Sequence, residues 1–186
     1  MKRTILALVL LGTPALLSQN AIAADPAPAT VKMNEVRQEI QGFGASGAFR
    51  QAAKIMYFPE PQRSEVMDTL FSPTKGAGLS IIRNIIGDSV LTLKRDVQMA
   101  GNCGTIEPEE GKWDWSADAD QVWLMQEAKK RGCTTFISAA WSSPAWMKTN
   151  NSVINGGNLK KDKYRAYAEY LAEYVNGYKK HHDLDI

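Results

Sequence analysis

The sequence predicts an α/β fold with a parallel sheet, because strand-like and helix-like segments alternate along the chain. Runs rich in β-branched and apolar residues at 79–86 and 134–140 alternate with segments of helical periodicity at 61–71 and 116–131. Strand, helix and strand in this order imply parallel strands joined by right-handed crossovers. The spacing of the two strands fits βα units in which one loop is elaborated.

The length of the chain limits the size of this sheet. A closed (β/α)8 barrel takes about 250 residues, and the whole chain has 186. The closing residues Leu184-Asp-Ile186 look like the opening of another strand, and a natural chain seldom halts one step into a buried strand. We therefore expect a partial (β/α)8 barrel of about the first three βα units, with a small open α/β sheet as the alternative.

The first residues are predicted to be a targeting segment. Met1-Lys-Arg is followed by an apolar stretch that continues to Leu17 and by small residues at Ala21-Ile-Ala23, as in a secretory signal peptide. The stretch is too short to span a bilayer, and no later segment approaches the roughly 20 apolar residues that a span needs. We therefore expect 1–23 to be removed and the protein to be secreted or periplasmic, without a membrane partner.

A leader and a glycine cluster follow the predicted signal peptide. Residues 24–35 begin with a short leader rich in proline and alanine, and Val36–Gln41 is predicted to be a polar, exposed strand. Gly42-Phe-Gly-Ala-Ser-Gly47 matches the dinucleotide-binding pattern G-x-G-x-x-G, which needs an apolar strand before it and an acidic residue about 20 positions later. Because the preceding residues are polar, the favoured interpretation is a close approach of two backbone segments.

Two helices and a long loop are predicted in the middle of the chain. The apolar side of the helix 61–71 carries Val66, Met67, Leu70 and Phe71. Residues 87–115 are too many for a simple connector, so they are expected to be functional or structured in their own way. Ser116 is the predicted N-cap of the second helix, which ends at Lys129-Lys-Arg131 before Gly132.

The last third of the chain predicts a buried strand and a long helix. Residues 134–140 are apolar enough for a strand buried on both faces. The apolar stripe of the helix is formed by Tyr164, Tyr167, Ala168, Leu171, Val175 and Tyr178. Cys103 and Cys133 belong to opposite ends of the predicted sheet, so no disulfide is expected between them, although export would permit one.

Charge indicates which partners the protein can have. The chain contains 22 Lys and Arg and 20 Asp and Glu, and removal of Lys2 and Arg3 leaves a formally neutral protein. A neutral protein has no electrostatic footprint for nucleic acid or anionic lipid. A neutral polymer or small molecule is therefore the expected partner.

Neither a metal nor a cofactor is expected. Asp114, Asp118 and Asp120 lack the glycine turn and the bidentate glutamate of a calcium loop, so they are interpreted as a solvated helix start. His181-His182 has no partner cluster that would complete a zinc site.

The segment Trp141 to Asn150 is the most informative part of the chain. Trp141 and Trp146 stand among short polar side chains directly after the strand 134–140, and function gathers at the carboxyl ends of strands in parallel α/β folds. A pyranose has apolar C–H faces and a rim of hydroxyls, so flat aromatic rings beside hydrogen-bonding groups suit it. The alternative is that both tryptophans only cap the core under a loop.

Two charged residues on or after the strand 79–86 are further candidates. Arg83 lies in an apolar strand, where an unpaired guanidinium is costly, so it either forms a structural ion pair or positions a catalytic carboxylate. Asp88, just past the strand, either binds a ligand hydroxyl or caps the loop.

Several segments together resemble a known family. They are 38–49, 79–87 and 140–150 with Gly156-Gly-Asn-Leu-Lys160. From about Val31 onward the chain is similar to glycoside hydrolase family 30, most specifically in the tryptophan segment. It looks most like the branch of xylan-degrading enzymes, while other branches act on glucosylceramide or on β-1,6-linked glucans and galactans.

The resemblance implies a secreted retaining β-glycanase, with an endo-1,4-β-xylanase acting on xylan or glucuronoxylan expected first. Its fold would be a (β/α)8 barrel with a β-structured side domain. A strand within 24–35 would belong to the side domain, and 36–186 would be the N-terminal part of the catalytic domain. Such enzymes use two glutamates, an acid/base and a nucleophile, about 5–5.5 Å apart.

In the family, the acid/base follows the fourth strand and the nucleophile lies near the seventh. Both are therefore expected beyond Ile186, and no catalytic residue is assigned in this chain. On this interpretation the chain is a truncated, inactive and marginally folded piece of the enzyme.

The same resemblance assigns part of a sugar site to this chain. Arg83 matches the arginine that supports the nucleophile, and Trp141 matches the aromatic floor of the subsite next to the cleaved bond. Asp88 and Trp146 are looser matches. The alternatives are a β-1,6-glucanase, galactanase or glucosylceramidase of the family, a non-catalytic carbohydrate-binding remnant, and an exported Rossmann-like oxidoreductase.

Overall fold

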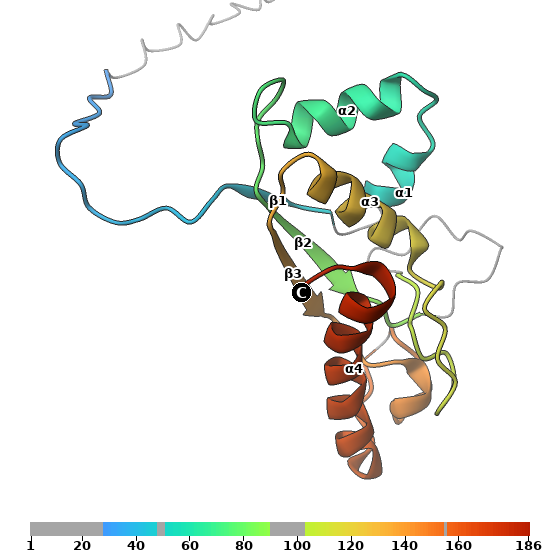
Figure 1. Ribbon diagram of the computed structural model, residues 1–186. Coiled ribbons are helices and arrows are strands. Elements are labelled where there is room, and N and C mark those ends of the chain that lie inside the picture. Colours follow the sequence, from blue (N-terminus) through green and yellow to red (C-terminus); the bar gives the residue numbers. More distant parts are fainter. Residues whose placement is uncertain (1–27, 48–50, 90–102, 155) are drawn as a thin grey trace, which may run out of the picture. The chain divides into compact units, whose positions relative to one another are not determined.

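The computed structural model describes residues 28–47, 51–89, 103–154 and 156–186 (Figure 1). Its contacts divide the chain into a unit that ends at Gln38 and a second unit, Glu39–Ile186. The predicted signal peptide, 1–23, lies outside the described residues, and so do positions 90–102 of the long predicted loop.

A parallel sheet of three strands forms the centre of the second unit. β1 (Gly44–Ser46), β2 (Ile81–Ile86) and β3 (Thr135–Ala140) lie side by side in chain order, and both pairs are parallel (Figure 1). The prediction of an α/β fold with parallel strands is therefore confirmed.

The first strand begins later than predicted. Residues 36–41 contain no strand and are exposed, and the described part of the expected side-domain strand, 28–35, contains only a turn at Met33–Asn34. A strand needs a neighbour that completes its hydrogen bonds. That pairing starts at Phe43, whose carbonyl accepts the N–H groups of Ser80 and Ile81.

The glycine cluster allows β1 to approach its neighbours, as the favoured interpretation required. A Cβ at Gly44 would lie 2.4 Å from the carbonyl oxygen of Ile81. A Cβ at Gly47 would lie 2.8 Å from Oδ1 of Asn84 and 2.9 Å from Cδ2 of Leu124. Gly44 therefore allows the close approach of two backbone segments, and Gly47 leaves room for the side chains of Asn84 and Leu124.

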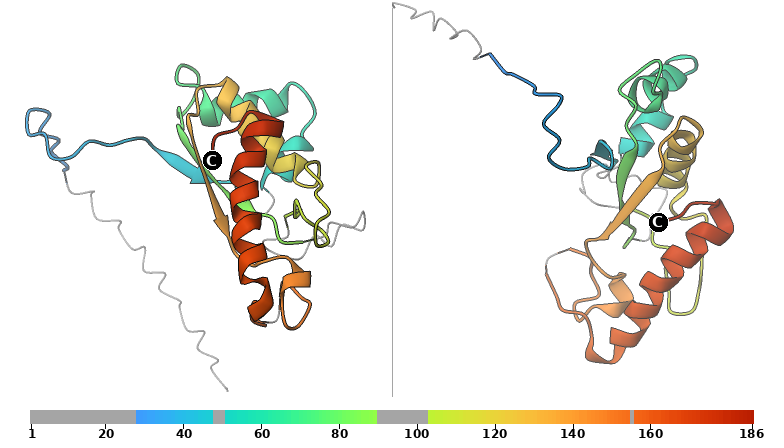
Figure 2. Two further views of the ribbon diagram at one scale, coloured as in Figure 1. Left: turned by 60° about the horizontal axis from the view of Figure 1, so that its bottom comes forward. Right: turned by 60° about the vertical axis from the view of Figure 1, so that its left-hand side comes forward.

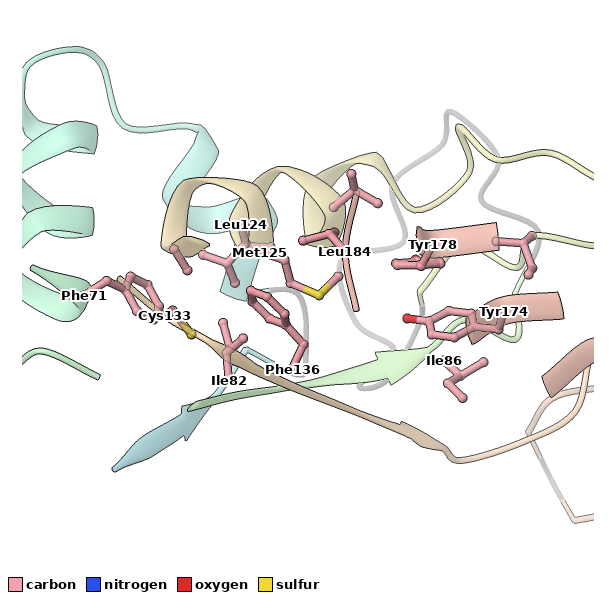
Figure 3. Packing of buried hydrophobic residues seen from close by; sticks show 14 of the residues in the cluster. Phe71, Ile82, Ile86, Leu124, Met125, Cys133, Phe136, Tyr174, Tyr178 and Leu184 are labelled. Atoms are coloured by element: carbon pink, nitrogen blue, oxygen red, sulfur yellow. The ribbon is translucent and has the colours of Figure 1, made fainter. Parts of the chain in front are cut away.

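Helices cover one face of the sheet (Figure 2). They are α1 (Gln51–Met56), α2 (Gln62–Phe71), α3 (Ala119–Lys130) and α4 (Tyr164–His182), with two short 3-10 helices, η1 (Ala145–Met147) and η2 (Lys161–Lys163). Alternate residues of a strand face opposite sides of the sheet. Ile82 and Phe136 accordingly point toward Leu124 and Met125 of α3 in the main core (Figure 3).

The opposite face of the sheet is less covered than predicted. β3 is not buried on both faces, because Phe136 is buried while its neighbour Ile137 is 48% exposed. Both cysteines are free and buried, in different clusters: Cys133 in the main core and Cys103 beside Ile85.

The start of α3 also differs from the prediction. The helix begins at Ala119, and the Ser116 hydroxyl donates to Asp114 at 2.6 Å instead of capping the helix. Asp118 is not a solvated residue but is buried, and its carboxylate accepts the hydroxyl of Tyr178 at 2.6 Å. The contact with α4 explains why a carboxyl group lies inside the core.

The buried face of α4 differs from the predicted stripe. Tyr170, Tyr174 and Tyr178 are buried, whereas Tyr164 is 58% and Val175 is 42% exposed. The hydroxyl groups of the three tyrosines find polar partners in the interior: Thr105, Ser138 of β3 and Asp118. The last residues, 184–186, form no strand, although Leu184 is buried in the core.

Candidate functional site

The carboxyl ends of β2 and β3 bring the predicted site residues to one end of the sheet. Ile86, the last residue of β2, pairs with Ala140, the last residue of β3. Trp141 follows β3 directly, and Asp88 comes two residues after β2. The parallel register therefore places both predicted residues at the carboxyl end of the sheet.

Arg83 and Trp141 form a pair on the face of the sheet that the helices leave open. In the register Arg83 is opposite Ile137, and side chains two positions apart in a strand share a face. The guanidinium carbon of Arg83 lies 5.9 Å from the centre of the Trp141 ring, within the range of a cation–π contact. Trp141 is 52% exposed, so much of the indole remains accessible to a ligand.

Arg83 makes no ion pair with any carboxylate among the described residues. The guanidinium is half-buried and contacts the Trp141 ring instead. Its N–H groups can therefore donate to a carboxylate or a ligand oxygen that approaches the open face.

Asp88 is buried at the start of the loop after β2. Its carboxylate accepts the hydroxyl of Ser89 at 2.6 Å, and its backbone N–H donates to Cys103 at 3.2 Å. Burial raises the pKa of Asp88, although the charge of Lys148 opposes this effect. Lys148 belongs to the tryptophan segment, and its ammonium group donates to the hydroxyl of Ser142 at 3.2 Å.

Trp146 lies in η1 and is held on several sides. Its indole N–H donates to the carbonyl of Glu107 at 3.0 Å, and its own carbonyl accepts from Lys160 at 2.9 Å. The ammonium nitrogen of Lys163 lies 5.6 Å from the ring centre and forms an ion pair with Glu110 at 2.7 Å. The ring is half-buried against the main core, so only part of it can face a ligand.

A second buried carboxyl group, Glu107, lies close to this segment. It accepts the backbone N–H of Gly111 at 2.8 Å, and burial raises its pKa. The sequence alone did not single out Glu107, Lys148 or Lys163 as site residues, although Lys148 lies within the segment Trp141 to Asn150. Their contacts depend on how the loop that contains Glu107 meets the tryptophan segment.

No group of three or more metal-ligating side chains occurs among the described residues. None of the described helices has the length and apolar character that crossing a bilayer requires. The groups that can contact a ligand at this site are therefore aromatic rings, a guanidinium and buried carboxyl groups.

Comparison with known proteins connects this geometry with carbohydrate chemistry. The model of glycosyl hydrolase family 59 matches residues 40–186. Galactocerebrosidase of Homo sapiens is 32% identical over 80% of this chain and 20% of its own length. Endo-1,6-beta-D-glucanase of Neurospora crassa is 25% identical over 90% of this chain and 34% of its own length.

Solved structures are similar over most of the chain. The catalytic domain of family 30 xylanase C from Talaromyces cellulolyticus has 34% sequence identity and a TM-score of 0.63, covering 80% of this chain and 35% of that domain. A conserved exported protein from Bacteroides fragilis has 25% identity and a TM-score of 0.69, with 81% and 33% coverage. The chain spans about a fifth of the length of the galactocerebrosidases that it matches.

Proposed function

Because the chain belongs to glycosyl hydrolase family 59, we propose that the whole protein is an exported retaining β-glycosidase. The predicted resemblance to family 30 agrees with this membership, since structures of that related family are similar to the chain. The predicted targeting segment at 1–23 supports export.

We further propose that the sheet is the start of a (β/α)8 barrel. The strand order β1-β2-β3, with helices on one face, is the arrangement of consecutive βα units. In such a barrel the face of the sheet that carries Arg83 and Ile137 points inward. The carboxyl ends of β2 and β3 lie at the end of the barrel that holds the active site.

The Arg83–Trp141 pair is the observation that carries the proposal. Trp141 presents an accessible ring on which the C–H face of a pyranose can stack, and Arg83 holds that ring from the strand beside it. Donors from Arg83 and an acceptor from Asp88 are suited to sugar hydroxyls and to a carboxylate near the cleaved bond. Trp146, which lies in η1, adds a second aromatic ring at the carboxyl end of the sheet.

The described residues supply binding but no catalytic pair. A retaining enzyme needs two carboxyl groups about 5–5.5 Å apart across the scissile bond. Asp88 and Glu107 are both buried, and each accepts a hydrogen bond from a nearby residue of the segment between β2 and α3. We therefore expect the 186-residue chain to bind a glycan without cleaving it.

Xylan is the first candidate substrate. The similarity to family 30 xylanase C, at 34% identity, supports endo-1,4-β-xylanase activity. The family 59 match and the galactocerebrosidases at 32% identity support a second candidate, hydrolysis of a β-galactoside. A β-1,6-glucan has weaker support, from a relative at 25% identity.

Affinity electrophoresis of the chain in gels that contain one polymer each tests this proposal. The gels hold glucuronoxylan, β-1,6-glucan, a β-galactan or α-linked dextran as the control. We expect retardation by glucuronoxylan and none by dextran, and no reducing ends released from any polymer. Retardation by galactan alone would select the second candidate over xylan. Release of reducing ends, or equal mobility in all gels, would contradict the proposal that this chain binds a glycan without cleaving it.

A further inference from the structure

An aromatic hollow lies on α4, on the helix side of the sheet and away from the Arg83 face. Its volume is about 210 Å³. The residues that line it include Trp113, Trp115, Glu173, Asn176, Lys180 and His181. None of them belongs to the site described above, so the proposed function leaves the hollow unexplained.

The rings of the hollow are nearly parallel. Trp113 and Trp115 have an interplanar angle of 7° with ring centres 5.9 Å apart, and His181 lies 4.6 Å from Trp115 at 16°. At 5.9 Å parallel rings are displaced sideways, so part of each face stays uncovered. Trp113 is 40% exposed and His181 is exposed. The hollow therefore presents aromatic surface to the solvent.

The backbone of α4 fixes the position of these rings. A Cβ at Gly177 would lie 1.8 Å from Cη2 of Trp115, so the ring rests where only a glycine leaves room. Trp113 also stacks near Tyr170, with centres 6.4 Å apart at 17°. The rings are thus ordered before any ligand arrives, which reduces the entropy lost on binding.

Polar side chains surround the rings. Glu173, Asn176 and Lys180 are spaced i, i+3 and i+7, so they share one face of α4. Their carboxylate, amide and ammonium groups form no hydrogen bond or ion pair with other residues of the described ranges. Together they offer acceptors and donors of both charges around an aromatic surface, without the excess of positive charge that phosphate recognition needs.

We propose that this hollow is a second carbohydrate-binding site, which holds a neutral pyranose unit of a β-linked polysaccharide and is separate from the Arg83–Trp141 pair. The ring faces contact the C–H surface of the sugar, and the α4 side chains bind its hydroxyls. A volume of about 210 Å³ is below that of pockets for drug-sized ligands, so one unit enters while the polymer continues into solvent. Such a site keeps the polymer near the Arg83–Trp141 pair.

The test uses the full chain with Trp141→Ala, so that the Arg83–Trp141 site does not dominate binding. In this background, Trp113→Leu is expected to lower the affinity for glucuronoxylan and for xylohexaose about fivefold. Trp123→Leu is the matched control, because Trp123 is a half-buried tryptophan of α3 outside the hollow. It should leave both affinities unchanged. Affinity electrophoresis and calorimetric titration measure them, with β-1,6-glucan as a second polymer.

A second variant separates binding from folding. Asn176→Ala with Lys180→Met changes only exposed side chains, so we expect an unchanged melting temperature and about threefold weaker binding. Equal binding by the parent, the Trp113→Leu variant and this double variant in both polymers would overturn the proposal. An equal loss from Trp123→Leu would also overturn it. Because every protein in the series carries Trp141→Ala, the result is independent of the sugar site proposed at Trp141.

Discussion

The side-chain amide of Gln121 forms two hydrogen bonds with the backbone of Ile85. Its Oε1 accepts the Ile85 N–H at 3.1 Å, and its Nε2 donates to the Ile85 carbonyl at 2.8 Å. β1 ends at Ser46, which pairs with Arg83, so Ile85 lies beyond the end of that neighbour. The Gln121 amide takes the place of a peptide group and positions the end of β2 that leads to Asp88.

Gln121→Leu is expected to destabilise the chain by about 2–4 kcal/mol, because it leaves a buried N–H and a buried carbonyl of Ile85 unpaired. Urea unfolding followed by circular dichroism measures the change. Gln62→Leu, an exposed position of α2, is the control and should stay within about 0.5 kcal/mol of the parent. Equal losses from the two substitutions would contradict the role of the amide.

Asp118 predicts how the stability of the protein depends on pH. Burial raises the pKa of Asp118 well above its ordinary value of 3.8. The folded chain therefore binds the proton more tightly than the unfolded chain, and the stability from this group is present below about pH 4 and lost as the pH rises toward the folded pKa. Asp118→Asn keeps an acceptor for the Tyr178 hydroxyl but removes the titrating group. The free energy of unfolding of this variant should therefore fall less between pH 4 and pH 7 than that of the parent.

The control for this measurement is Asp162→Asn, which changes an exposed carboxylate of η2. Its free energy of unfolding should show the same pH dependence as that of the parent. The account of Asp118 is wrong if the parent and the Asp118→Asn variant lose equal stability over the interval. Asp88 and Glu107, whose pKa values are also raised, are present in all three proteins and do not affect the comparison.

Tyr170 connects the core to the candidate site. Its hydroxyl donates to the carbonyl of Gly87, next to Asp88, and lies 3.0 Å from Oγ1 of Thr105. Tyr170→Phe should cost about 1–2 kcal/mol of stability and weaken glycan binding, because the loop of Asp88 loses its anchor. Tyr174→Phe removes a hydroxyl that contacts Ser138 of β3 instead, and should leave binding unchanged. Equal binding by both variants in xylohexaose titrations would contradict this positioning role.

The sheet and the main helices could be predicted because their apolar residues follow clear periodicities. α2 and β2 lie within two residues of their predicted bounds. α1 could not be predicted, since six residues are too few to show a helical period. The buried face of α4 was predicted only in part: Tyr178 is buried and Tyr167 and Leu171 pack against the core, but the buried Tyr170 and Tyr174 were missed because tyrosine is both apolar and polar. Tyr170 and Tyr174 turn inward where hydroxyl partners exist, while Val175 stays outside.

The candidate site could be predicted only in part. Arg83 and Trp141 come together because the hydrophobic pattern of the strands sets their register, and alternate residues of a strand share a face. The roles of Lys148 and Lys163 depend on how long loops fold against each other, and sequence spacing carries little information about that. Asp118 was interpreted as solvated because its partner, Tyr178, is 60 residues away in sequence.

Calorimetric titration of the chain and its Trp141→Ala variant with xylohexaose tests the central claim most directly, with Trp123→Ala as the matched control. We expect Trp141→Ala to lower the affinity about tenfold, because the accessible indole beside Arg83 supplies the stacking surface. Trp123→Ala should bind like the parent. Equal affinity of the parent and the Trp141→Ala variant would contradict the claim that the open end of this sheet binds a sugar.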